Sequence, residues 1–254
     1  MAVSVSPGTP LQAEDASSGG RLPRPLRIGA LLFDGIDQID LTGPFEVLSR
    51  LPGAEYRIYA RTLDPVRDVM GLRLLPDATL DEAPSLDILH VPGGVGQEDL
   101  MGDEHVHMWL RRQSATAACI LSVCTGALLL GGAGLLRGRR ATTHWASHDL
   151  LPSFGAVAVD RRVVVDGKWI FAAGVTAGID GALTLAGRLF GDRTAQRIQL
   201  DIAYAPEPPY DSGTPDRAPD DVLASARAAG SAIRRRREAT ARRFEQQFDS
   251  HSTG

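Results

Sequence analysis

Short apolar runs alternate with helix-like stretches from residue 26 to residue 202, and this alternation restricts the possible folds more than any other feature. The runs Leu86–Val91 and Cys119–Val123 each end in turn residues and lead into a stretch with helical periodicity. Strands that alternate with helices form mostly parallel sheets with helices on both faces. The sequence therefore predicts an α/β fold, and 254 residues suit one such domain with additional ends.

The two ends differ in composition from this alternating region. Residues 1–24 are rich in Ser, Pro, Gly and Ala, which predicts a disordered extension. Residues 25–205 are the predicted catalytic domain, and residues 206–219 are a predicted Pro-rich loop. Residues 220–248 are predicted to form one helix that packs on the domain or extends from it. Its run Arg234–Arg237 is interpreted as a solvated helix face rather than a polyanion contact, because the run is short and the net charge is −4.

Four polar segments are predicted to end strands at the sheet edge where open α/β folds bind ligands. They are Ile39-Asp40, Pro92-Gly93-Gly94, Ser122-Val123-Cys124-Thr125-Gly126 and Thr142-Thr143-His144-Trp145. A helix is predicted to follow the first of them over Pro44–Leu51, with its proline in the first turn and Thr42 or Gly43 as its cap. A hairpin is predicted at Asp166-Gly167, between strands Val157–Val165 and Trp169–Ala173.

Cys124 is the candidate nucleophile of this edge. Small residues two positions to either side permit the sharp strand-to-helix turn of a nucleophile elbow. The positive end of the following helix is expected to lower the thiol pKa and to favour the thiolate. A buried, unreactive cysteine is the alternative, and the spacing by itself favours neither. Cys119, at the start of the same strand, is interpreted as a core residue.

The neighbouring segments supply candidate partners for Cys124. The backbone N–H groups at Gly93-Gly94 and Thr125 are candidates to stabilise negative charge or to position a substrate. Asp40 is a candidate acid and base if burial raises its pKa, and capping of the following helix is an equally compatible role. His144 either pairs with Cys124 or packs, and the sequence does not decide between these roles.

Composition excludes several functional classes. The net charge of −4 gives no general attraction for nucleic acid or for an anionic membrane. The two cysteines have neither a disulfide framework nor the spacing of a metal site, and no metal is predicted. No apolar stretch is long enough to span a bilayer, and the first 20 residues lack the pattern of a secretory signal. We therefore expect a cytoplasmic protein.

Taken together, the motifs resemble those of the ThiJ/PfpI superfamily, and most closely the isonitrile hydratases within it. The similar segments are Ile39–Pro44, Val91–Gly94, Ser122–Gly126, Ala141–Ala146, Thr176–Asp180 and Tyr204–Pro209. The resemblance covers about residues 26–243. It implies a flavodoxin-like three-layer sandwich related to the class I glutamine amidotransferases, and a homodimer. PfpI-type peptidases follow the cysteine with a histidine, so Thr125 disfavours a peptidase.

The resemblance also implies an activity. Isonitriles would be hydrated to N-substituted formamides, with Cys124 as nucleophile, Asp40 as acid and base, and Thr125 beside them. A small-molecule substrate is implied, and no cofactor is required. Two alternatives remain: another cysteine-dependent hydrolase or glyoxalase-type enzyme, and a non-enzymatic ligand or oxidative-stress sensor.

Overall fold

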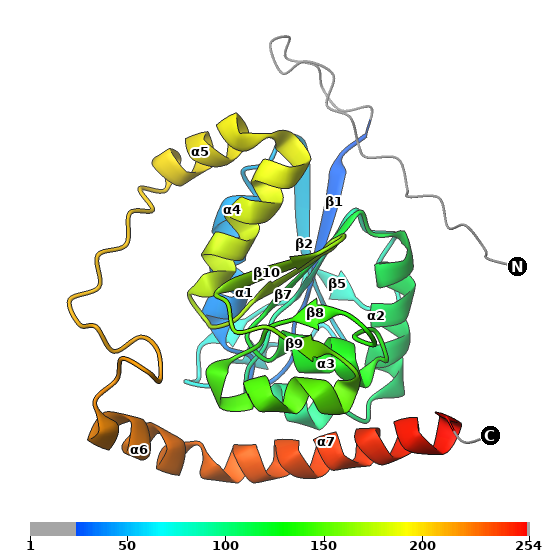
Figure 1. Cartoon of the computed structure of the whole chain (residues 1–254). Helices are drawn as coiled ribbons and strands as arrows, with labels where there is room; N and C mark the ends of the chain where they lie inside the picture. Colours follow the sequence, from blue (N-terminus) through cyan, green and yellow to red (C-terminus); the bar gives the residue numbers. More distant parts are fainter. Residues whose placement is uncertain (1–23, 253–254) are drawn as a thin grey trace, which may run out of the picture.

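The computed structural model describes residues 24–252, so the extension predicted over residues 1–24 lies almost wholly outside the described residues. A seven-stranded sheet crosses the centre of the domain (Figure 1). Its strand order is β10 (Val163–Asp166), β11 (Trp169–Ala172), β7 (Cys119–Val123), β6 (Ile88–Val91), β1 (Leu26–Leu31), β2 (Ala54–Ala60) and β5 (Ala78–Thr79). Every neighbouring pair is parallel except the hairpin of β10 and β11.

Two apolar cores flank this sheet and make it the middle of three layers. One core packs α1 (Gln38–Leu48), α4 (Ala177–Phe190) and α5 (Asp192–Asp201) against one face. The other holds α2 (Glu104–Thr116), α3 (Gly126–Gly132) and the 3-10 segments η1 (Val95–Leu100) and η2 (Trp145–Phe154) near the opposite face (Figure 1). The central strands β6 and β7 are buried along their whole length, as continuous apolar runs in parallel sheets require. The predicted α/β sandwich is confirmed.

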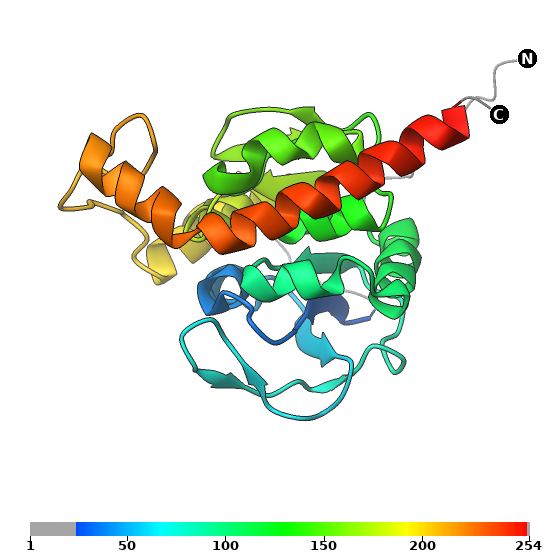
Figure 2. The ribbon, with the colours of Figure 1, turned by 90° about the horizontal axis from the view of Figure 1, so that it is seen from below.

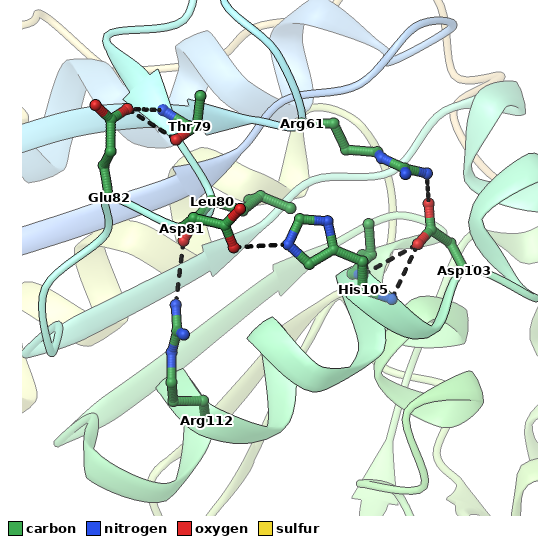
Figure 3. Close-up of polar contacts among 9 residues, drawn as sticks. Arg61, Thr79, Leu80, Asp81, Glu82, Asp103, His105 and Arg112 are labelled. Carbon is green, nitrogen blue, oxygen red and sulfur yellow. Dashed lines mark hydrogen bonds and ion pairs between the residues drawn. The ribbon is translucent and has the colours of Figure 1, made fainter.

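Salt bridges and hydrogen bonds tie the β5 edge of the sheet to α2 (Figure 3). The Asp103 carboxylate accepts from two backbone N–H groups at the start of α2 and pairs with Arg61. The His105 ring lies 2.8 Å from the Asp81 carboxylate, and Arg112 donates to the Leu80 carbonyl at 3.1 Å. These contacts join α2 to the β5 edge of the sheet. The described residues hold no set of three His, Cys, Asp or Glu side chains suited to a metal ion, here or elsewhere.

The chain ends in two helices, where the sequence predicted one. α6 (Asp220–Ala229) and α7 (Ser231–Ser252) are separated at Gly230, a residue that disfavours continuous helix. α7 packs along η2 and η1 and crosses the lower edge of the domain in Figure 1, facing the viewer in Figure 2. Residues 206–219 contain no helix or strand. No helix in residues 24–252 has both the length and the apolarity needed to cross a membrane.

Two predicted elements were placed wrongly. The helix expected to begin at Pro44 begins at Gln38 instead, because the Asp37 side chain accepts a hydrogen bond from the Ile39 N–H and caps the helix there. Pro44 therefore lies inside the helix, and neither Thr42 nor Gly43 is its cap.

The second error concerns the strand before Thr142. β8 (Arg140–Ala141) pairs with β9 (Val157–Ala158) in a separate two-stranded sheet, as β3 (Val66–Arg67) does with β4 (Arg73–Leu74). The predicted strand over 157–165 is consequently divided between β9 and β10. Local periodicity identified these strands but not their partners, because pairing depends on distant segments.

Candidate active site

Cys124 lies on the sharp turn that joins β7 to α3. Its φ of +54° is in the left-handed region, which residues other than glycine rarely adopt. Its N–H donates to the Ala172 carbonyl of the neighbouring strand at 2.9 Å, which holds the strained residue in place. The backbone thus has the geometry of the nucleophile elbow that the sequence predicts.

Two glycines allow the turn after β6 to approach this elbow. A Cβ atom on Gly126 would lie 2.1 Å from the Val91 carbonyl oxygen, and one on Gly93 would lie 2.5 Å from the Thr125 nitrogen. Both distances are far below van der Waals contact. The ends of β6 and β7 therefore meet only because both positions lack side chains.

Asp40 projects from the first turn of α1 and is fully buried. The Gly93 N–H donates to its Oδ2 at 2.9 Å, and the Cys124 thiol adjoins its carboxyl group. Burial, and secondarily the charge of Asp37, raise the pKa of Asp40 to about 8. The carboxyl group is therefore protonated near neutral pH. The capping role that the sequence left open for Asp40 is excluded, because Asp37 caps α1.

The environment of Cys124 raises its pKa, contrary to the sequence-based expectation. Cys124 is 6% exposed, and burial of the thiol, followed by repulsion from Asp40 when that group is ionised, disfavours the thiolate. The Thr125 N–H and the Arg237 guanidinium act in the opposite direction. The helix end fails to dominate because α3 has only seven residues and the thiol is almost completely desolvated.

Thr125 connects the elbow to the turn after β6. Its hydroxyl oxygen lies 3.1 Å from both the nitrogen and the carbonyl oxygen of Gly94, so it accepts from the first and donates to the second. The Gly94 N–H is thereby occupied and is not free to bind an oxyanion as the sequence suggested. The Gly93 N–H is likewise taken by Asp40. Only the Thr125 N–H, among these three groups, is directed at Cys124.

His144 lines the same cleft but makes no hydrogen bond to Cys124. Its Nδ1 accepts from the Ala146 N–H at 3.3 Å, and burial followed by the charge of Arg237 lowers its pKa to about 4. His144 is therefore a neutral capping residue of η2. The preceding Thr143 reaches the elbow, since its hydroxyl donates to the Cys124 carbonyl at 2.7 Å.

A second buried histidine supports the backbone of Asp40. His90 on β6 is fully buried, its Nδ1 lies 2.6 Å from the Tyr56 hydroxyl, and its ring contacts the Asp40 carbonyl. Pro44 lacks the N–H that a regular helix would direct to that carbonyl. Burial lowers the pKa of His90 to about 3, so the ring is neutral.

A cleft of about 850 Å³ opens above Cys124, Thr125 and His144. Helices α6 and α7 form one side of the cleft, and apolar side chains contribute part of its lining. The apolar lining residues are Val69, Val95, Trp145, Val175 and Ile233.

The C-terminal helix contributes a buried cation to this cleft. Arg237 of α7 is 7% exposed, and its Nη2 donates to the Gly94 carbonyl at 2.9 Å. The interpretation of the arginine run as a solvated face was therefore wrong for this residue. Ile233, Ala241 and Phe244 recur at helical spacing with Arg237, and this apolar pattern was the signal that could have placed it on the packed face.

Comparisons with known proteins identify relatives of this chain. The sequence pattern of the DJ-1/PfpI family matches residues 26–187. Isonitrile hydratase of Pseudomonas putida is 51% identical over 218 residues, which cover 85% of this chain and 96% of that enzyme. A crystal structure of a ThiJ/PfpI family protein from Pseudomonas syringae superposes with a TM-score of 0.83 at 34% identity, covering 91% of this chain and 98% of that one.

A regulator contains a similar domain. The HTH-type transcriptional regulator GbdR of Pseudomonas aeruginosa is 34% identical over 208 residues. The match covers 78% of this chain but only 54% of the regulator.

Proposed function

The chain belongs to the DJ-1/PfpI family, whose flavodoxin-like sandwich it shares, and we propose that it is a hydro-lyase that hydrates isonitriles to N-substituted formamides. One observation carries the proposal: Cys124 lies on a strained elbow that lines the cleft, and Asp40, a buried carboxyl group with a raised pKa, adjoins it from behind the cleft wall. The 51% identity to an isonitrile hydratase over nearly its whole length supports the choice of substrate.

In the first step the Cys124 thiolate attacks the terminal carbon of R–N≡C. The carbon receives the proton of the Asp40 carboxyl group as the S–C bond forms, which gives a thioimidate, R–N=CH–S–Cys, and an Asp40 carboxylate. The proposed acid must hold a proton at neutral pH, and the pKa of about 8 meets this requirement.

In the second step the Asp40 carboxylate takes a proton from water as the water oxygen bonds to the same carbon, and passes that proton to the nitrogen. The tetrahedral adduct, R–NH–CH(OH)–S–Cys, then collapses. Its C–S bond breaks, the hydroxyl proton returns to Asp40, and R–NH–CHO leaves with the thiolate regenerated. The reactive form of the Cys124 and Asp40 pair holds one proton, on Asp40, and the cycle ends in that form. Because both pKa values are raised, this form arises from the doubly protonated pair by loss of the thiol proton.

The lining of the cleft is suited to this substrate class. An isonitrile carbon is small and carries no ionised group, so binding depends mainly on burial of the R group. Val95, Trp145 and Val175 offer apolar surface near Cys124 for that group. We also propose a homodimer, by analogy with the family; a monomer mass in light scattering would contradict it.

The test is formamide production from cyclohexyl isocyanide by the purified chain and three variants. We expect turnover to disappear in Cys124→Ser and in Asp40→Asn, and to persist in Cys119→Ser. Cys119 is the matched control, because it lies buried at the other end of the same strand and does not line the cleft. Turnover that survives Cys124→Ser would contradict the mechanism. A folded wild-type protein inactive on alkyl and aryl isonitriles would contradict the proposed substrate class.

A further inference from the structure

Arg237 is a buried cation whose hydrogen bonds go to neutral groups. It donates to the Gly94 carbonyl at 2.9 Å, to Gln97 Oε1 at 3.2 Å and to Ser147 Oγ at 3.3 Å, with the Thr125 hydroxyl at 3.5 Å. A desolvated guanidinium is costly unless a negative charge compensates it. None of the four acceptors carries a charge, so the compensating group must be sought nearby.

The charged groups around Arg237 identify that partner. The Cys124 thiolate acts on the guanidinium most strongly, ahead of the Glu98 carboxylate of η1. The Glu98 carboxylate also accepts a hydrogen bond of 2.5 Å from Thr240. Arg234 and Arg236 on the same helix repel the Arg237 charge.

Among the groups that act most strongly on Cys124, Arg237 is the cation that favours the thiolate. Asp40 and Asp37 of α1 disfavour the thiolate, as does burial, whereas Arg237 and the Thr125 N–H favour it. His144 of η2 is neutral, because its pKa is lowered to about 4.

We propose that Arg237 is a positioning residue of the reaction centre: from α7 it supplies the charge that stabilises the Cys124 thiolate and holds the Thr125 hydroxyl and the Gly94 carbonyl in place. The C-terminal helix is then part of the reaction centre rather than an accessory layer. This inference rests on the proposed function in one respect, since it assumes that Cys124 reacts as a thiolate.

The physical scale of the effect follows from Coulomb's law. An opposite unit charge within about 4 to 6 Å of an ionisable group shifts its pKa by about one to three units. Loss of the Arg237 charge should therefore shift the pH midpoint of thiolate formation upward by at least about one unit. At a fixed pH below the midpoint, the thiolate population would fall about tenfold.

The experiment measures the rate constant of Cys124 alkylation by iodoacetamide at fixed pH values between 6 and 9, with Cys119→Ser as the background. These values lie below the raised midpoint of the thiol, so the rate constant reports the thiolate population. Iodoacetamide is uncharged, so removal of Arg237 does not alter its attraction to the cleft. Arg237→Gln and Arg237→Lys are compared with Arg236→Gln and Arg236→Lys. Arg236 is the matched control, because it lies on the same helix, is exposed and pairs with Asp99 on the surface.

At each pH the alkylation rate should fall about tenfold in Arg237→Gln and by less in Arg237→Lys, which keeps the charge, and it should remain at the wild-type value in both Arg236 variants. A role limited to packing would lower the unfolding temperature without changing the rate, and that result would overturn the proposal. If Arg237→Gln does not fold, the uncharged Arg237→Met decides: a wild-type alkylation rate in that variant would also overturn the proposal. Alkylation requires no isonitrile, so a lowered rate in an enzyme without hydratase activity would refute the proposed substrate while leaving this inference intact.

Discussion

Replacement of Asp40 by asparagine should make the protein more stable at pH 8, although it should abolish the proposed hydration. A carboxyl group with a pKa near 4 in the unfolded chain and about 8 in the folded protein is protonated only in the folded state between these values. Unfolding therefore releases about one proton in this window, and the free energy of unfolding falls as the pH rises. This loss of unfolding free energy is absent below pH 4 and complete above pH 8.

The magnitude follows from the width of the window. One pH unit corresponds to about 1.4 kcal/mol per proton, so the three units from pH 5 to pH 8 amount to about 3 to 4 kcal/mol. Asparagine has nearly the same shape but does not titrate. From pH 5 to pH 8, the free energy of unfolding of Asp40→Asn should therefore increase by this amount relative to that of the wild type.

Urea unfolding of both proteins at pH 5, 6, 7 and 8 measures this difference. Asp149→Asn is the control, because Arg234 lowers the pKa of Asp149 and its contribution is constant across the window. Parallel stability profiles for Asp40→Asn and the wild type would refute the raised pKa, and with it the role of Asp40 as an acid at neutral pH.

Two further predictions concern the backbone of the site. Gly126→Ala should destabilise the protein by about 2 kcal/mol or more in urea unfolding, because its Cβ would lie 2.1 Å from a carbonyl oxygen of β6. The control Gly102→Ala, whose Cβ would meet nothing within 4 Å, should leave the stability nearly unchanged. Equal effects of the two substitutions would contradict the steric argument. His90→Phe should cost about 1 to 3 kcal/mol in unfolding free energy, because phenylalanine lacks the ring nitrogens that face the Tyr56 hydroxyl and the Asp40 carbonyl. Pro44→Ala restores a helical N–H to that carbonyl and should offset part of this loss in the double variant, whereas strictly additive unfolding energies would contradict the link.

The sequence by itself determined the order of the main elements and the position of the elbow. Continuous apolar runs and turn residues are local signals, so β7 was predicted with its observed bounds, Cys119–Val123. The small residues around Cys124 likewise predicted a strained turn that the φ of +54° displays. These features depend on steric preferences within a few residues, which the amino-acid order fixes directly.

Only the tertiary structure decided the electrostatics of the site. The sequence predicted a lowered pKa for Cys124 from one helix end, but burial by both layers and the nearby Asp40 raise it. The sequence left a capping role open for Asp40, and the start of α1 gave that role to Asp37. Arg237 stands 112 residues from Thr125 in the chain and reaches its hydroxyl only because α7 packs across η1 and η2. Desolvation and charge–charge interactions depend on distances in space, and these are set by packing between segments far apart in sequence.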